Sequence, residues 1–264
     1  MVVGGGPGGL KAAAVAAARG HHVTLHEKNK QLGGQALLAQ LLPRRAEFGG
    51  IVSNLTRECE LAGVDLRTRS TVDRAFIERE APDAVVVATG ATPRELPADR
   101  FENTHVVNAW QVLRGETNVG SRVVVPDWRC DWIGMGIAEM LALDGCQVRL
   151  AVDGYMAGQT LQSYVRDAWA GELFRAGVEV VPYAHLFGAD EDSVYFEHTA
   201  SREPLVLKEV DTLVLALGQA PSRALEFELQ GLDIESHFVG DCLAARTAEE
   251  AVYEGLKVGR AVGG

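Results

Sequence analysis

The chain has 264 residues, which is enough for two domains of ordinary size that each bury their own core. Its formal net charge of -11 argues against nucleic acid or an anionic membrane surface as a partner. No apolar stretch approaches the ~20 residues that cross a membrane, and no signal peptide precedes the first motif. These properties predict a cytoplasmic protein that binds neither nucleic acid nor membranes.

A glycine-rich loop opens the chain. Met1–Val3 is typical of a strand, and Gly4, Gly6 and Gly9 follow it in the order G-x-G-x-x-G. Gly4 permits a tight turn, Gly6 lets the backbone approach a pyrophosphate, and Gly9 lets the next helix press on the strand. An alanine-rich helix is expected over 10–19, with its free N–H groups directed at the phosphates. The loop therefore predicts a dinucleotide-binding domain.

A second strand is expected from His22 to His26, and it delivers the acidic residue Glu27. Glu27 follows Gly4 by 23 residues, close to the spacing of ~20 at which a carboxylate meets the adenosine ribose hydroxyls. The first strand is short, since about five or six residues are usual in a buried strand. We therefore expect the chain to be a piece of a longer protein, or one subunit of a split one, with the missing part upstream.

The rest of the chain alternates helices and buried strands. The expected elements are a helix over 47–62, strands at 64–66 and 84–91, a connector over 105–120, a strand at 122–126, a helix over 133–144, a strand at 147–152, a helix over 161–176, strands at 178–181, 194–197, 205–207 and 211–218, a final strand at 237–241 and a last helix from about 247. The alternation predicts a first domain over 1–104 and 222–264 and an inserted second domain over 105–221.

Four elements occur in the same order as in the flavoproteins with two dinucleotide-binding domains. They are the glycine loop, an A-T-G turn at Ala88–Gly90, L-x-L-G-x-x-P at Leu215–Pro221 and V-G-D at Val239–Asp241. Within that group the chain resembles the C-terminal half of the old-yellow-enzyme-type NADH:flavin oxidoreductases, the family of trimethylamine dehydrogenase, dienoyl-CoA reductase and the N-methyl amine demethylases. The resemblance covers essentially the whole chain.

A further match to that branch is Gly33-Gly34-Gln35 followed by Pro43 and Glu47. The resemblance implies an α/β fold, in which a Rossmann-like FAD- or ADP-binding domain carries an inserted, degenerate Rossmann-like domain of the NAD(P) type. It also implies that Glu27 binds the ribose and that Asp241 binds the ribityl chain or the phosphates of a flavin. The candidate cofactor-binding residues are Gly4, Gly6, Pro7, Gly8, Gly9, Glu27, Lys28, Gly33, Gly34, Gln35, Ala88, Thr89, Gly90, Gly240, Asp241, Arg246 and Thr247.

Physical reasoning supports the role of Asp241, because a carboxylate accepts hydroxyl hydrogen bonds and the last helix can direct N–H groups at an anion. A cap or turn role is the alternative for Asp241, and a simple turn after a strand is the alternative for Gly90.

The inserted domain departs from the pattern where a second G-x-G-x-x-G would bind NAD(P)H. Gly134 keeps the helix-packing position, but Arg129 and Asp131 stand where phosphate-facing glycines belong, and two residues are inserted. Asp131 would repel a pyrophosphate. Arg129 would pair with a neighbouring aspartate, Asp127 or Asp131, or with a phosphate. We expect this domain to fold without binding NAD(P)H.

Three functions remain open. The first is the nucleotide-binding half of a flavin-dependent amine dehydrogenase or demethylase, whose FMN and iron–sulfur cluster the resemblance assigns to an upstream TIM barrel outside this chain. Electrons would then leave to an electron carrier flavoprotein. The second is the FAD-binding half of an NAD(P)H-dependent enoate or dienoyl-CoA type reductase, which requires the damaged second loop. The third is a non-catalytic assembly domain.

The sequence also leaves FAD and ADP open. In the trimethylamine dehydrogenase branch the same site can hold ADP alone, and this chain shares with that branch a broken second loop and an arginine, Arg246, after the Gly-Asp element. An arginine near the place of the flavin ring would fill it or stabilise a reduced flavin anion. The alternative for Arg246 is a solvated residue ahead of the last helix.

No catalytic constellation is visible. The four cysteines, Cys59, Cys130, Cys146 and Cys242, contain no C-x-x-C pair, so we expect reduced core thiols and no disulfide reductase chemistry. The seven histidines are scattered along the chain. We therefore expect neither a catalytic residue nor a metal site in this chain.

Overall fold

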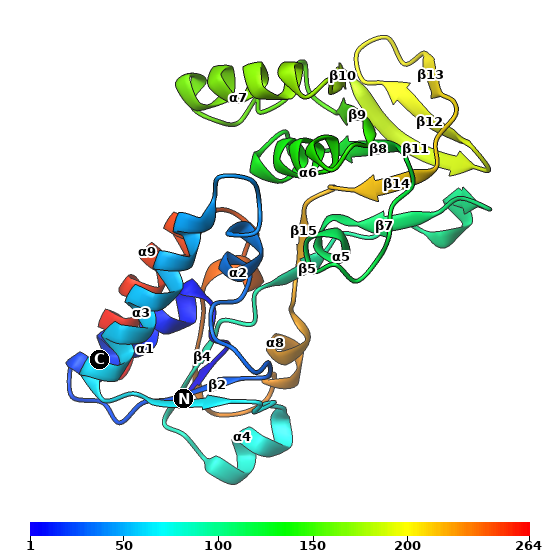
Figure 1. Ribbon diagram of the computed structural model, residues 1–264. Helices are drawn as coiled ribbons and strands as arrows, with labels where there is room; N and C mark the ends of the chain where they lie inside the picture. The colour runs from blue at the N-terminus through cyan, green and yellow to red at the C-terminus, as the bar shows by residue number, and fades with distance from the viewer. The chain divides into compact units, whose positions relative to one another are not determined.

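The computed structural model describes residues 1–264, which form two compact units. Unit 1 comprises Met1–Gln40, Arg44–Thr92 and Gln219–Gly264, and unit 2 comprises Leu41–Pro43 and Pro93–Gly218. Figure 1 shows the course of the chain through both. Unit 2 therefore interrupts unit 1 in sequence.

Unit 1 contains a five-stranded parallel sheet with the strand order β16-β4-β1-β2-β3. The strands are β1 (Val2–Val3), β2 (Thr24–Glu27), β3 (Asp65–Thr68), β4 (Ala84–Val87) and β16 (Glu235–Phe238). Strand β1 lies in the middle although it is the shortest, and it brings the glycine loop to the centre of the sheet edge. Open parallel sheets bind ligands at this carboxyl edge.

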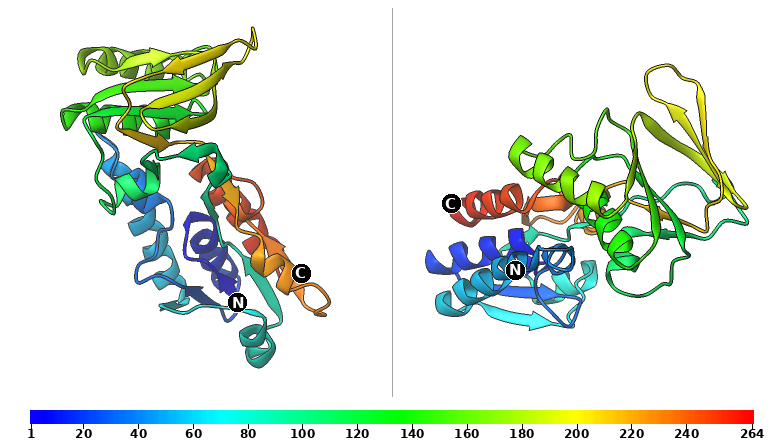
Figure 2. Two further views of the ribbon diagram at one scale, coloured as in Figure 1. Left: turned by 90° about the vertical axis from the view of Figure 1, so that its right-hand side faces the viewer. Right: turned by 45° about the horizontal axis from the view of Figure 1, so that its top comes forward.

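Helices cover both faces of that sheet. One face carries α1 (Pro7–Ala18), α3 (Gly49–Ala62) and α9 (Ala248–Ala261), and the other face carries α4 (Arg74–Glu80) and α8 (Ala224–Glu228). Helix α1 contacts both α3 and α9, and the three run side by side in Figure 1 and Figure 2. Short helices α2 (Ala36–Ala39), η1 (Ala46–Phe48) and η3 (Gly240–Cys242) complete the unit.

Unit 2 is built on a second five-stranded parallel sheet, in the order β10-β9-β8-β14-β7. Its strands are β7 (Val106–Asn108), β8 (Arg122–Asp127), β9 (Gln147–Val152), β10 (Glu179–Val181) and β14 (Thr212–Leu215). One face is covered by α5 (Ala109–Leu113), α6 (Trp132–Leu143) and α7 (Ser163–Arg175).

A mixed layer, antiparallel except for its edge strand β6, packs on the other face of that sheet. It has the order β13-β12-β11-β6, with β6 (Phe101–Glu102), β11 (Ala184–Asp190), β12 (Ser193–His198) and β13 (Pro204–Leu207). Successive side chains of β8 point to opposite faces of the sheet. Val123 and Val125 pack under the helices, whereas Val124 packs on the strands of the second layer. The helix η2 (Ala98–Arg100) precedes β6, and β5 (Ala91–Pro93) pairs with β15 (Gln219–Pro221).

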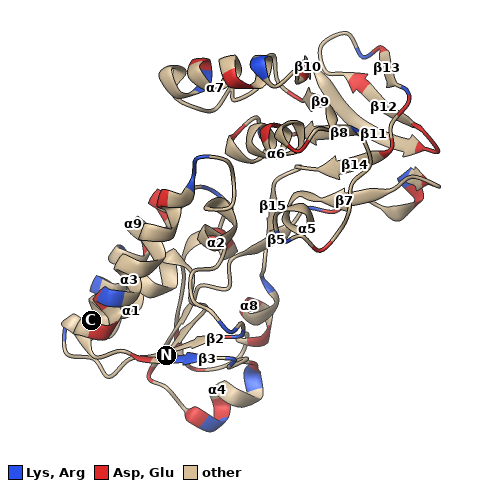
Figure 3. Cartoon of the chain, viewed as in Figure 1, with Lys and Arg blue, Asp and Glu red and all other residues tan.

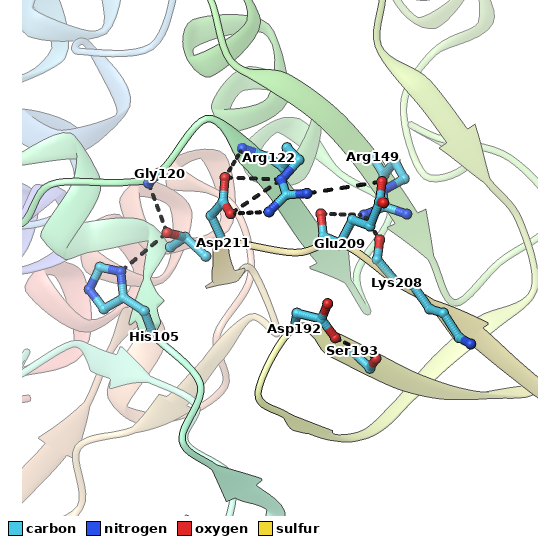
Figure 4. Close-up of polar contacts among 10 residues, drawn as sticks. His105, Gly120, Arg122, Arg149, Asp192, Ser193, Lys208, Glu209 and Asp211 are labelled. Atoms are coloured by element: carbon cyan, nitrogen blue, oxygen red, sulfur yellow. Dashed lines mark hydrogen bonds and ion pairs between the residues drawn. The ribbon is translucent and has the colours of Figure 1, made fainter.

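A polar cluster fastens the amino ends of β8 and β14. Asp211 accepts hydrogen bonds from the backbone N–H of Arg122 at 2.9 Å and from its guanidinium at 2.6 Å (Figure 4). The guanidinium lowers the pKa of the Asp211 carboxyl below its ordinary value. Thr212 links the same ends to Gly120 and His105. This cluster is structural, since it lies at the opposite end of β8 from the second loop.

The structure differs from the sequence expectation at several places, of which three are in unit 2. Residues 93–104 belong to unit 2 rather than to the first domain, because β6 pairs with β11. The expected connector over 105–120 contains β7 and α5, which extend the second sheet. Strand β11 was not expected, and it is bent by a register shift between Leu186 and Gly188.

Candidate functional site

The glycine loop of unit 1 is shaped by close backbone contacts. A Cβ on Gly4 would overlap the carbonyl of Ala88, and a Cβ on Gly9 would overlap the carbonyl of Gly4. Gly6 differs from both, because a Cβ placed on it would meet no atom within 4 Å. The loop therefore needs Gly4 and Gly9 for packing, whereas Gly6 faces open space.

The N-terminus of α1 has no side-chain cap. Gly6 is its N-cap residue, Pro7 stands at the first helical position, and no acidic residue lies in the first turn. Gly8 and Gly9 follow and are buried. The first-turn N–H groups and the helix dipole therefore make a place for an anion beside Gly6.

A second loop follows β2 and faces the first. The Gly33 N–H donates to the carbonyl O of Gly5 at 2.7 Å. A Cβ on Gly34 would lie 3.2 Å from the Cα of Gly6, so these two backbones approach closely. The predicted residues Gly33, Gly34 and Gln35 thus lie beside the glycine loop.

Glu27 ends β2 with its side chain turned toward the loop and only 6% exposed. Its Oε2 accepts from the Gly5 N–H at 2.8 Å, and its Oε1 accepts from the backbone and side-chain amides of Asn29, both at 2.8 Å. Each carboxylate oxygen has two lone pairs, so Oε2 keeps capacity for another donor. Lys28 is exposed at the surface.

The turn Ala88–Gly90 closes β4 next to β1. The Ala88 N–H donates to the carbonyl O of Val3 at 2.8 Å, and Thr89 Oγ1 donates to the carbonyl O of Ser222 at 2.9 Å. The Ser222 N–H donates in return to the carbonyl O of Gly90 at 2.9 Å. The turn is therefore fixed by the segment that returns from unit 2.

Asp241 is held from two sides. Its Oδ2 accepts from Gln35 Nε2 at 2.7 Å, and its Oδ1 accepts from the Arg246 N–H at 3.2 Å. The structure thus brings Asp241 together with the Gly33–Gln35 loop, which the spacing in the sequence does not reveal. The guanidinium of Arg246 pairs with Glu254 and donates to the carbonyl O of Ala244 at 3.3 Å.

The N-terminus of α9 is capped by its own side chains. Thr247 caps the helix in a capping box, in which its N–H donates to Glu250 Oε2 at 3.1 Å. The first turn also carries Glu249. Because the Glu250 carboxylate already serves the helix end, α9 is less suited to an anion than α1.

In unit 2 the corresponding loop is filled by its own carboxylates. Asp127 ends β8, and its Oδ1 accepts from the N–H groups of Arg129 at 3.0 Å and Cys130 at 2.9 Å. Asp131 caps α6 by accepting from the Ile133 N–H at 3.0 Å. Arg129 pairs with Asp131 at 2.7 Å, the structural ion pair that was one expected alternative.

Asp127 is completely buried, and its Oδ2 has no hydrogen-bond partner. Burial raises the pKa of this carboxyl to about 8, helped by the nearby charge of Asp131. A Cβ on Gly134 would overlap Oδ2. Gly134 therefore makes room for the Asp127 side chain, which corrects the expectation that it packs the helix directly on the strand.

The acidic position after β9 is also occupied. Asp153 directly follows β9, a position comparable to that of Glu27 at the end of β2. The Oδ1 atom of Asp153 lies 3.0 Å from His185 Nδ1. The His185 ring stacks on Trp128, with ring centroids 4.7 Å apart. Side chains of unit 2 therefore bind one another at the edge where a dinucleotide would lie.

Sequence reasoning missed Asn29, Asp153, His185 and Glu254. Asp153, His185 and Glu254 make contacts that no sequence motif encodes. Asn29 could have been noticed, because asparagine favours turns and this one lies two residues after Glu27.

Cys59, Cys130 and Cys242 are buried free thiols, and burial raises the pKa of Cys59 and of Cys130 to about 11. Such thiols are poor nucleophiles.

Charges of both signs are mixed over the surface. Figure 3 shows acidic and basic residues side by side on α4 and on α7. No helix is both long and apolar enough to span a bilayer.

Comparisons with known proteins give one consistent result. A model of the pyridine nucleotide-disulphide oxidoreductase family matches residues 1–253. The N,N-dimethylglycine/sarcosine dehydrogenase of Chromohalobacter salexigens is 32% identical over 98% of the chain, and the bilirubin reductase of Mediterraneibacter gnavus is 34% identical over 97%. The structure of 6-hydroxypseudooxynicotine amine oxidase from Pseudomonas geniculata N1 covers the whole chain with a TM-score of 0.89 and 26% identity.

The chain spans 39 to 43% of the length of these three proteins. The expected resemblance to the C-terminal half of amine dehydrogenases and demethylases is confirmed, as is the α/β class with a Rossmann-like fold.

Proposed function

Because the chain belongs to the pyridine nucleotide-disulphide oxidoreductase family, we propose that it is the adenine-nucleotide-binding module of a flavin-dependent amine dehydrogenase or demethylase. Unit 1 binds the nucleotide, as FAD or ADP, and unit 2 is a folded domain that binds no NAD(P)H. The substrate is oxidised in an upstream part that carries FMN and an iron–sulfur cluster, and electrons leave to a carrier flavoprotein.

The observation that carries this proposal is the contrast between two helix ends. Helix α1 begins without a cap or an acidic residue beside an open Gly6. Helix α6 begins on Asp131, next to the buried carboxyl of Asp127. An anionic pyrophosphate is favoured at the first end, whereas at the second the charge of Asp131 opposes it.

The residues of unit 1 fit an adenine nucleotide. The space that a Cβ on Gly6 would take is available to a phosphate, and Gly34 faces the same place with only backbone. Glu27 would accept a ribose hydroxyl through the free lone pair of Oε2, and Asp241 would accept hydroxyls or orient the second phosphate. When FAD is bound, it supplies the redox chemistry, and these residues bind and orient it.

The second candidate is the FAD-binding half of an NAD(P)H-dependent enoate or dienoyl-CoA type reductase. The 34% identity to bilirubin reductase favours it. It requires NAD(P)H at the start of α6, where Asp127 and Asp131 stand. The third candidate is a domain that serves assembly alone. It does not explain why the space beside Gly6 is open.

The test uses the full-length protein. Heat release and chromatography identify the bound nucleotide, and anaerobic spectra follow flavin reduction by N-methyl amines and by NADH. We expect FAD or ADP in the extract, reduction by an amine and none by NADH. Rapid reduction of the flavin by NADH would contradict the dehydrogenase proposal and favour the reductase. A preparation that binds neither FAD nor ADP would favour the assembly domain.

A further inference from the structure

Helix α9 approaches the glycine loop at two adjacent residues, Glu254 and Gly255. A Cβ on Gly255 would overlap the carbonyl of Gly8, so the backbones of α9 and α1 touch at this point. Close-packed backbones leave little freedom for the helices to slide. The Cα of Glu254 is therefore fixed next to the first turn of α1.

The carboxylate of Glu254 reaches the Gly-Asp element. Its Oε2 accepts from the Gly240 N–H at 2.7 Å, and its Oε1 pairs with the guanidinium of Arg246. Gly240 has φ of +70°, a left-handed conformation that favours glycine. The Glu254 side chain is 18% exposed, so water screens these contacts only in part.

These contacts orient Asp241. Glu254 fixes the residue before Asp241 and the side chain of Arg246, whose N–H donates to Asp241 Oδ1 at 3.2 Å. Gln35 fixes the other carboxylate oxygen at 2.7 Å. Asp241 is thus oriented from α9 on one side and from the Gly33–Gln35 loop on the other.

We propose that Glu254 is a positioning residue of the nucleotide site, which holds the segment 240–246 so that Asp241 faces the ligand. The proposal rests on the proposed function, because the ligand is the adenine nucleotide of unit 1. A segment that is ordered before binding does not lose conformational entropy when the ligand arrives. Glu254 therefore raises affinity without touching the nucleotide.

The test compares Glu254→Ala and Glu254→Gln with the control Glu249→Gln, in which an exposed carboxylate of the same helix is removed. Nucleotide is stripped from the full chain, and ADP and FAD are titrated back by calorimetry. We expect Glu254→Ala to weaken the affinity for the nucleotide by about 10- to 100-fold, which is the effect of losing a hydrogen bond to a charged group. Glu254→Gln should be intermediate, since its amide oxygen still accepts from Gly240 but does not pair with Arg246.

Hydrogen exchange at the Gly240 amide, measured without nucleotide, supplies a readout independent of binding. It should be faster in Glu254→Ala and unchanged in Glu249→Gln. Wild-type protein that binds neither ADP nor FAD would reject the proposed function itself. Wild-type binding with equal affinity in Glu254→Ala would reject only the positioning role, even if that variant melted at a lower temperature.

Discussion

Replacing Gly6 by valine should weaken nucleotide binding strongly and leave the fold intact. Gly6 has φ of -77° and ψ of 178°, an extended conformation that valine adopts readily. A Cβ there meets no atom within 4 Å, so the side chain enters space that a phosphate would fill. The substitution therefore separates binding from folding.

The expected loss follows from the contacts that valine blocks. A phosphate oxygen must come within about 2.9 Å of a backbone N–H to accept its hydrogen bond. A charged hydrogen bond contributes about 1.5–3 kcal/mol, so losing two at the lower value costs about 3 kcal/mol, roughly a 150-fold weaker affinity. The free energy of unfolding without nucleotide should change by no more than about 1 kcal/mol, because valine is a poorer N-cap residue than glycine.

Calorimetric titration of the stripped protein with ADP and FAD measures the first quantity, and thermal melting without nucleotide measures the second. Gly50→Ala is the matched control, because its Cβ also meets open space but lies on α3. Gly9→Ala, in contrast to Gly6→Val, should destabilise the fold of unit 1, by about 1–3 kcal/mol, since its Cβ would overlap the Gly4 carbonyl. Wild-type nucleotide content in Gly6→Val would refute the assignment of the loop.

Three further outcomes are expected. Glu27→Ala should weaken adenosine binding by about 1.5–3 kcal/mol and also lower the melting temperature, because Gly5 and Asn29 lose their acceptor; an unchanged dissociation constant would remove Glu27 from the site. Because burial raises the pKa of Asp127 from 3.8 to about 8, its contribution to stability is complete below the lower value and is lost as the pH rises through the higher one. The melting temperature of Asp127→Asn should therefore rise relative to that of the wild type progressively from about pH 4 to about pH 8, and a difference that stayed constant over this range would contradict the raised pKa. Calorimetry with millimolar NADH and NADPH should show no saturable heat beyond exchange in unit 1, whereas micromolar binding at unit 2 would favour the reductase.

Local signals predicted the elements that carry the first site. The glycine loop and the alanine-rich run predicted α1, and the spacing to Glu27 predicted the end of β2. These features are encoded within about thirty residues, where glycine sterics and helix propensity dominate. Packing at a distance was needed to place Asp241 beside Gln35.

Elements of unit 2 were harder to predict where they are short or irregular. Strand β7 has three residues and α5 has five, too few for a periodic pattern. The capping box of Asn108 and Gln111 was a readable signal for that helix. Strand β11 was missed because its bulge at Gly188 breaks the alternation of apolar residues.

The role of Gly134 shows a limit of motif matching. A glycine at the packing position of a Rossmann loop indicates a helix that touches the strand backbone, as Gly9 does in unit 1. In unit 2 the same residue type accommodates a carboxyl group from Asp127. A pattern of residue types does not reveal which neighbour fills the space that a glycine leaves.

The pairing of α1 with α9 has a consequence for the order in which the protein can fold during synthesis. Arg19 donates to the carbonyl O of Gly259 at 3.1 Å and to that of Val262 at 2.8 Å, which joins residues 240 or more apart in the chain. Unit 2 uses an almost continuous stretch and can form as soon as it leaves the ribosome. Unit 1 is complete only when its last helix has been made, and the part of α1 that packs on α9 stays uncovered until then. Chaperones that hold nascent chains would therefore still meet this part of α1 long after it was made.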